Sequence, residues 1–273
     1  MSRQTGGSAF GEWSEQYVRH AVVFTEKAGV NSTVLDSAAD FDAVVQNLAF
    51  SLCLYSGQMC TTPQNLFIPS GGIRDAAGPI PFDDAAARIV SAIDGLLGDP
   101  KRAVEVLGAI QNEATVRRIA AAAGEGGKVL RPAASIPHPQ FPNARVHSPL
   151  VVAVDASDTR LFAREMFGPI IYVVRTRDTA ESVRLAADIA RNQGSITAGV
   201  YSTDANVLRS AEDELTLAGV PVSANLVGSI WVNQAAAFSD FHVSGANPAG
   251  NATLCDGAYV CRRFRVVQQR VPV

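Results

Sequence analysis

The fold is decided by residues 170–201, which read IIYVVRTRDTAESVRLAADIARNQGSITAGVY. Apolar and β-branched residues fill 170–174 and 196–201, and both segments are therefore predicted to be buried strands. Between them, the sequence DTAE at 178–181 is a variant of the capping box and predicts a helix to about residue 192. A strand, a helix and a second strand in succession indicate a parallel pair joined by a crossover helix.

The same alternation extends in both directions along the chain. Further strands are predicted at 21–25, 32–35, 65–68, 149–154 and 229–232, and a strand-like tail at 264–267. Further helices are predicted from Asp40 to before Gly57, from 81 to 97, from Asn112 to before Gly124, and from about Asp204. The fold class that follows is α/β, with a mainly parallel open sheet and helices on both faces.

Composition limits the kinds of protein that this chain can be. It has 273 residues, of which 47% are hydrophobic and 18% charged, as in a globular protein that buries a large core. The net charge of −3 argues against a nucleic-acid partner, since such proteins usually carry a basic face. No apolar run approaches the roughly 20 residues of a membrane span, so no membrane partner is expected. The four cysteines include no C-x-x-C pair, which predicts reduced thiols, no metal site and a cytoplasmic protein.

Cys60 is the strongest candidate for a chemical role. It lies in the polar, glycine-containing segment SGQMCTT at 56–62, outside the apolar helix that holds Cys53. A thiol that is exposed in such a loop is a potential nucleophile, whereas Cys53 is expected to be a small buried core residue. Glu26 and Glu165, considered separately, are ordinary loop carboxylates. The stretch GGSAFG at 6–11 is only a weak phosphate-loop signal, because no strand is predicted before Gly6.

Five segments taken together resemble the aldehyde dehydrogenase superfamily, and they occur in that family's order. They are TGGSAFG at 5–11, TEKAG at 25–29, GQMC at 57–60, EMFGP at 165–169 and IWVN at 230–233. The resemblance implies that Cys60 is the nucleophile and Glu26 the general base of aldehyde oxidation. It also implies that Glu165 and Phe167 contact the nicotinamide end of NAD or NADP, and that Gly6 and Gly7 lie near the cofactor phosphates.

The finer wording LYSGQMCTTPQN at 54–65 resembles the phenylacetate-degradation branch, whose enzymes oxidise a ring-opened, coenzyme-A-linked semialdehyde. The resemblance covers only the C-terminal half of the family. The expected division is therefore 1–30 as a remnant of a largely missing Rossmann-like domain, 31–246 as the catalytic domain, and 247–273 as a crossing segment and oligomerisation strand. An edge strand at 262–270 is expected to join a homo-oligomer.

Three functional readings remain open from the sequence. The first is the catalytic half of an NAD(P)-dependent aldehyde dehydrogenase, which by itself is expected to bind dinucleotide weakly and to form no measurable NAD(P)H. The second is a non-enzymatic truncated remnant that only associates with other subunits. The third is a weak, cofactor-free thiol esterase that uses Cys60 and Glu26.

Overall fold

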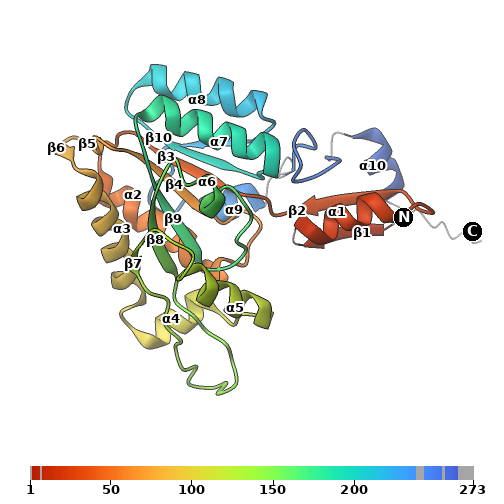
Figure 1. The fold of residues 1–273 in the computed structure, drawn as a ribbon, viewed down its shortest axis with the longest axis horizontal. Coiled ribbons are helices and arrows are strands. Elements are labelled where there is room, and N and C mark those ends of the chain that lie inside the picture. The colour runs from red at the N-terminus through yellow and green to blue at the C-terminus, as the bar shows by residue number, and fades with distance from the viewer. Residues whose placement is uncertain (1, 7, 238–242, 254–255, 264–273) are drawn as a thin grey trace, which may run out of the picture.

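The structure is a computed structural model that describes residues 2–6, 8–237, 243–253 and 256–263. Figure 1 shows a large α/β lobe and a smaller lobe beside it. The large lobe is built on a seven-stranded sheet, which is parallel except for β7. In spatial order its strands are β11 (Val222–Ala224), β10 (Ala198–Tyr201), β3 (Ser32–Leu35), β4 (Asn65–Pro69), β9 (Ile170–Thr176), β8 (Leu150–Asp155) and β7 (Lys128–Arg131).

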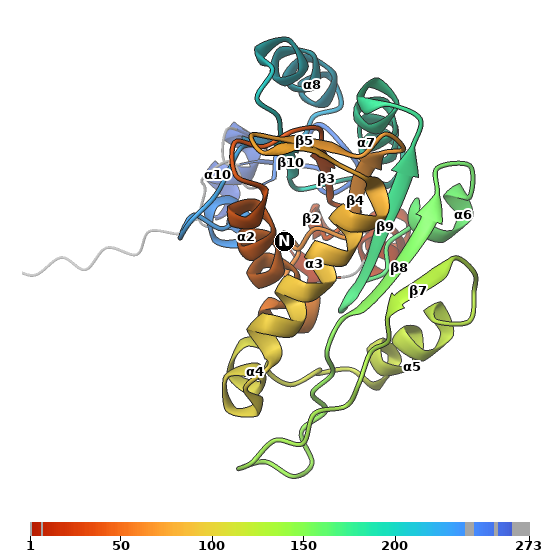
Figure 2. The same cartoon turned by 90° about the vertical axis from the view of Figure 1, so that its left-hand side faces the viewer.

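Helices cover both faces of this sheet (Figure 2), which confirms the predicted fold class. One face carries α2 (Phe41–Cys53), α3 (Phe82–Leu97) and α4 (Pro100–Leu107). The other carries α5 (Glu113–Ala122), α6 (Thr159–Phe162), α7 (Thr179–Gln193) and α8 (Ala205–Leu217).

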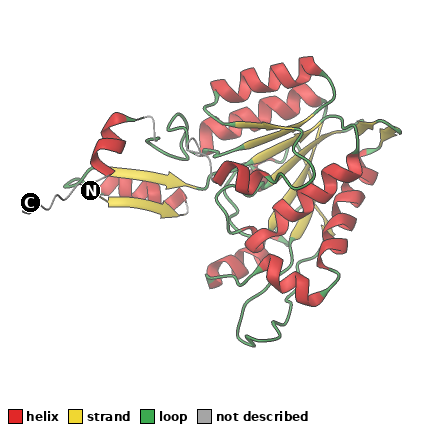
Figure 3. Cartoon of the chain, turned by 180° about the vertical axis from the view of Figure 1, so that it is seen from behind, coloured by secondary structure: helices red, strands yellow, loops and turns green. Residues whose placement is uncertain are grey.

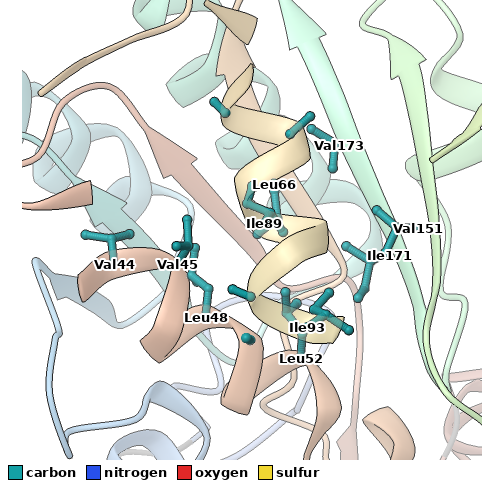
Figure 4. Close-up of a cluster of buried hydrophobic side chains, with 14 of the residues drawn as sticks. Val44, Val45, Leu48, Leu52, Leu66, Ile89, Ile93, Val151, Ile171 and Val173 are labelled. Carbon is teal, nitrogen blue, oxygen red and sulfur yellow. The ribbon is translucent and has the colours of Figure 1, made fainter. Parts of the chain in front are cut away.

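Strand alternation divides the core into two layers. Leu66 and Val173 pack under α2 and α3, as Figure 4 shows, whereas Phe67, Tyr172 and Val174 belong to the layer beneath α7 and α8. All five of these side chains are 0–1% exposed, so both faces of the central strands are dry. Near-continuous apolar runs are the expected sequence of a parallel strand that is buried on both sides.

The polar residues predicted to begin helices do so. Asp40, Asn112, Asp178 and Asp204 each accept a hydrogen bond from a backbone N–H in the first turn of α2, α5, α7 and α8. These bonds satisfy donors that the first helical turn leaves unpaired.

The smaller lobe is a parallel strand–helix–strand unit (Figure 3). It consists of β1 (Ser2–Gly6), α1 (Ser8–Tyr17) and β2 (Val23–Lys27). The expectation that no strand precedes Gly6 was wrong, because the polar run SRQTG pairs with β2 in full register. A late segment completes this lobe, since Ala249 accepts a 2.6 Å bond from the Lys27 N–H and α10 (Gly257–Arg263) packs Tyr259 against Phe24.

The strand predicted at 229–232 was also wrong. The carbonyl of Ile230 in this segment and that of Gly228 just before it accept hydrogen bonds from the Asn47 side chain, at 2.9 and 3.2 Å. Trp231 packs in a tilted arrangement against Phe50 of α2, with ring centroids 4.3 Å apart, and α9 (Val232–Ala237) begins directly afterwards. Tertiary contacts with α2 therefore replace the strand, and β11 is the sheet edge.

The remaining differences concern short segments. The hairpin of β5 (Ile73–Asp75) and β6 (Gly78–Ile80), helices α1, α4 and α6, and strands β7 and β11 were not predicted. Of the edge strand predicted at 262–270, residues 262 and 263 end α10, and the remainder lies outside the described residues. No helix in the described parts of the chain has the length and hydropathy needed to cross a membrane.

A buried carboxylate braces the carboxyl end of β3. Asp36 accepts hydrogen bonds from Thr179 (2.6 Å), Ser37 (2.7 Å) and Ser202 (2.8 Å), and it pairs with Arg74 at 3.1 Å. Burial by itself would raise the pKa of Asp36, but the three hydroxyl bonds and Arg74 outweigh it and hold that pKa below its ordinary value.

Asp36→Asn should lower the free energy of unfolding by about 2 kcal/mol at neutral pH, because the amide cannot accept the same set of bonds. The lowered pKa means that the wild-type contribution is complete above about pH 4 and disappears as the pH falls through the folded-state pKa. Urea unfolding near pH 7 and pH 3 checks this. The difference from wild type should shrink at the lower pH, and the exposed Asp42→Asn should show little effect at either.

Candidate active site

A left-handed turn brings the chain from α2 to Cys60. Tyr55, Ser56 and Gly57 all have positive φ, at 53°, 53° and 64°. Such angles strain residues that have a side chain, and this strain is typical of functional segments. The Ser56 hydroxyl donates to the carbonyl of Leu107 at 3.0 Å, which fixes the turn from one side.

Gln58 fixes the same turn from the other side. Its Nε2 donates to the carbonyls of Tyr55 (2.9 Å) and Ala109 (3.1 Å), and its Oε1 accepts from the N–H of Gln111 at 3.0 Å. The conformation of the loop before Cys60 is therefore determined by side-chain bonds to the segment that follows α4.

Cys60 lies at a small cavity at the amino ends of β3, β4 and β9. The cavity is lined by residues from three segments, 28–31, 57–64 and 166–168, and its volume is about 20 Å³, which is room for one water. Phe167 is part of the lining. The segments with the predicted base, nucleophile and cofactor residues therefore converge in space, although they are far apart in the sequence.

Burial raises the pKa of the Cys60 thiol to about 11, and the Glu26 carboxylate adds to that rise. The backbone N–H groups of Cys60 and Thr61 act in the opposite direction and lower that pKa. Glu26 is on β2, in the small lobe, so its electrostatic effect on Cys60 acts between the two lobes. The structure thus brings together the two residues predicted as nucleophile and base.

Glu165 lies at the start of α1. One carboxylate oxygen accepts a 2.9 Å hydrogen bond from the backbone N–H of Ser8, which is the first residue of that helix. Its other oxygen, Oε1, and the Ser8 hydroxyl are buried and have no hydrogen-bond partner among the residues that the structure describes. Gly6 ends β1 directly before this helix, and Gly7 lies outside the described residues. Buried polar atoms that lack partners indicate a place where a ligand can supply them.

Two further residues, which no sequence motif indicates, hold this site in place. Gln64 donates to the carbonyls of Phe162 and Arg164, both at 3.0 Å, and accepts from the Met166 N–H at 2.7 Å. Arg118 donates to the carbonyl of Phe167 at 2.6 Å. Only their contacts with the 162–167 loop reveal this role. Within the described residues, no group of three or more His, Cys, Asp or Glu could hold a metal ion.

Cys60 should be alkylated by iodoacetamide at least about tenfold faster than Cys53, because reaction requires an accessible thiolate. Cys53 is 0% exposed and burial raises its pKa to about 12, whereas Cys60 is partly exposed with a pKa of about 11. Peptide mapping at short times separates both from the exposed Cys261. Equal labelling of Cys53 and Cys60 would contradict the arrangement described above.

Comparison with known proteins gives one consistent family. The sequence model of the aldehyde dehydrogenase family matches residues 3–254. The crystal structure of an NAD-dependent aldehyde dehydrogenase from Burkholderia multivorans matches 99% of this chain, with a TM-score of 0.91 and 50% identity, and the match covers 48% of that protein.

Curated relatives agree at lower identity. The N-succinylglutamate 5-semialdehyde dehydrogenase of Vibrio cholerae is 31% identical over 186 residues, which are 66% of this chain and 35% of the relative. The NADP(+) succinate-semialdehyde dehydrogenase of Deinococcus radiodurans is 24% identical over 84% of this chain and 43% of the relative. The chain therefore spans less than half the length of these proteins.

Proposed function

Because this chain belongs to the aldehyde dehydrogenase family, we propose that it provides the catalytic residues of an enzyme that oxidises an aldehyde to a carboxylate with NAD or NADP. The observation that carries this proposal is that Cys60 and Phe167 line one cavity, while the Glu26 carboxylate of the other lobe acts electrostatically on the Cys60 thiol. A cysteine with a carboxylate nearby supplies the nucleophile and the base that such a reaction needs.

The residues act in a fixed order. The Cys60 sulfur attacks the aldehyde carbon to give a thiohemiacetal, whose oxyanion is stabilised by backbone donors such as the Cys60 N–H. A bound nicotinamide nucleotide supplies the hydride acceptor. The resulting thioester is then hydrolysed by water, from which Glu26 removes a proton. The Glu26 carboxylate repels the Cys60 thiolate. Acylation removes the negative charge of the sulfur and therefore also removes this repulsion.

The described residues fit a dinucleotide. The unit β1–α1–β2 has the strand–turn–helix order of dinucleotide sites, in which the helix N-terminus faces phosphate. At that terminus, Glu165 Oε1 and the Ser8 hydroxyl are buried and find no partner in the described parts of the chain, and a ribose offers hydroxyl groups that would satisfy both. Glu165 would hold the nicotinamide ribose, and Phe167 would pack beside the ring. Calorimetric titration with NAD and NADP tests this assignment, with Glu165→Gln as the variant that should weaken binding.

For the substrate, we propose the ring-opened, coenzyme-A-linked semialdehyde of phenylacetate degradation. The support is the resemblance of residues 54–65, which form the turn and the nucleophile loop. The two curated relatives described above are both named as semialdehyde dehydrogenases. A panel of this thioester, succinate semialdehyde and N-succinylglutamate semialdehyde distinguishes the assignments. A clear preference for either free acid would replace the coenzyme-A-linked substrate.

We also propose that residues 1–30, 31–246 and 247–273 act as cofactor-side, catalytic and association segments, and that the chain forms a homo-oligomer in the cytoplasm. The open sheet edge at β11 and the exposed Leu217, Val227 and Ile230 support association, since apolar side chains beside an unpaired strand favour a partner. Light scattering of the full chain against a version that ends at residue 263 tests the tail's part. A monodisperse monomer would contradict it.

The central experiment measures the formation and hydrolysis of the Cys60 thioester, two steps that need only Cys60 and Glu26. An activated ester such as p-nitrophenyl acetate should acylate Cys60, as detected by mass spectrometry, and turnover should disappear in Cys60→Ala. Cys261→Ala is the matched control, because that thiol is exposed and distant in sequence. Acylation confined to Cys261, or unchanged turnover in Cys60→Ala, would contradict the proposal. If the ester is hydrolysed rapidly and no aldehyde is oxidised when NAD or NADP is added, the thiol esterase is favoured instead.

A further inference from the structure

Asn31 lies directly before β3 and joins two loops at the cavity. It is 3% exposed, and both ends of its side-chain amide are fully used. Nδ2 donates to the carbonyls of Cys60 (2.6 Å) and Thr62 (3.1 Å). Oδ1 accepts from the Ser195 hydroxyl and from the N–H groups of Ile196 and Thr197, at 2.9–3.1 Å. The amide thus connects the nucleophile loop to the segment that leads into β10.

The hydrogen bond from Asn31 to the Cys60 carbonyl affects the Cys60 sulfur through one peptide group. The carbonyl of Cys60 and the N–H of Thr61 belong to the same planar trans peptide and point in opposite directions. The Thr61 N–H is one of the two backbone groups that lower the pKa of the Cys60 thiol. Holding the carbonyl therefore sets the direction of that N–H, and a hydrogen bond to the carbonyl also polarises the peptide and strengthens its donor.

We infer that Asn31 is a positioning residue for the nucleophile: its amide orients the Cys60–Thr61 peptide so that the Thr61 N–H faces the sulfur. The inference rests on the proposed role of Cys60. It does not require Asn31 to touch the substrate, because the side chain acts through the backbone. All its hydrogen-bonding capacity is spent on protein groups, which leaves none for a ligand.

Because few charged groups surround Cys60, a change in its ionisation can be traced to a change in its backbone hydrogen-bond donors. The described residues that line the cavity include no ionisable group other than Cys60 itself. Glu26, on β2, is the charged side chain that shifts the pKa of Cys60. A neutral substitution at Asn31 leaves Glu26 in place, so a change in thiolate formation reports the peptide donors.

Asn31→Leu and Asn31→Ser are the test variants. Both are neutral, and neither can donate to the two carbonyls at once. Asn47 provides the matched control, because it is also 3% exposed and also donates to two backbone carbonyls, those of Gly228 and Ile230, outside the cavity lining. Thiolate ultraviolet absorbance is titrated in the full chain and corrected with the same variant carrying Cys60→Ala. Circular dichroism confirms folding, and Asn31→Ser, the smaller change, carries the test should Asn31→Leu fail to fold.

The expected result is an upward shift of the Cys60 titration by about one pH unit in both Asn31 variants, with a roughly tenfold slower alkylation near pH 8. Asn47→Leu and Asn47→Ser should lose stability without shifting the titration. A folded Asn31 variant with an unchanged titration overturns the inference, as does an equal shift in the Asn47 variants. Failure of the proposed function would show in a different experiment, as unchanged ester turnover in Cys60→Ala. The two failures are distinguishable because the titration needs no catalysis.

Discussion

Glu26→Gln should make Cys60 react faster with iodoacetamide and, in the same protein, slow the hydrolysis of its acyl form. The carboxylate raises the pKa of Cys60, so removing its charge lowers that pKa and increases the thiolate fraction near neutral pH severalfold. Hydrolysis of the thioester loses its general base, which should cost about 10²–10⁴ in rate. Stopped-time alkylation and the decay of acylated Cys60, both followed by mass spectrometry, measure the two effects.

The opposite signs make this prediction strict. A misfolded variant would not combine faster alkylation of Cys60 with slower deacylation and continued protection of Cys53. Glu12→Gln is the matched control, because that carboxylate is exposed on α1 of the same lobe. A Glu26→Gln protein that deacylates at the wild-type rate would remove Glu26 from the role of base.

Gly57→Ala should lower the free energy of unfolding by at least about 3 kcal/mol. Gly57 has φ +64°, which costs about 1–2 kcal/mol for a residue with a side chain. A Cβ there would also overlap the backbone carbonyl of Gly168 and lie 3.0 Å from the nitrogen of Pro169, so the nucleophile loop must move away from the 165–169 loop. Urea unfolding measures the stability, and acylation of Cys60 should fall with it.

Gly71→Ala is the control for this substitution. Gly71 has no atom within 4 Å of its ideal Cβ position and lacks a positive φ, so its replacement should be nearly neutral. If Gly57→Ala unfolds like wild type and acylates normally, the close approach of the two loops is not required for the site.

The sequence predicted the elements whose signals are local. Asp40, Asn112 and Asp178 mark helix starts because a short acceptor at an N-cap needs only its own next residues. The strand at 229–232 failed for the opposite reason. Its β-branched and aromatic residues are typical of a strand. However, the Asn47 side chain of α2 donates hydrogen bonds to the carbonyls of Gly228 and Ile230, and no local sequence pattern indicates those bonds. Likewise β1 is polar and exists through pairing with β2.

The site divides in the same way. Cys60 and Glu26 were predicted from motifs; in the structure Cys60 lines the cavity, and the Glu26 carboxylate acts electrostatically on its thiol. Asn31, Gln64 and Arg118 act through single side-chain bonds to distant backbone carbonyls, so only the folded chain identifies them. The positive φ of Tyr55 and Ser56 was equally hidden, since neither residue type favours it.

Because Glu26 and Cys60 lie in different lobes, the pKa of the Cys60 thiol depends on how the two lobes are oriented relative to each other. Only residues 28–30 separate the end of β2 from Asn31, and Val30 is tied to the large lobe by a 2.8 Å bond to Gly194, while Lys27 is tied to Ala249. A ligand that tilts the small lobe therefore changes the distance from carboxylate to sulfur at once, with no relay through intervening side chains. Binding of such a ligand to the small lobe and the acidity of the Cys60 thiol would then be thermodynamically linked.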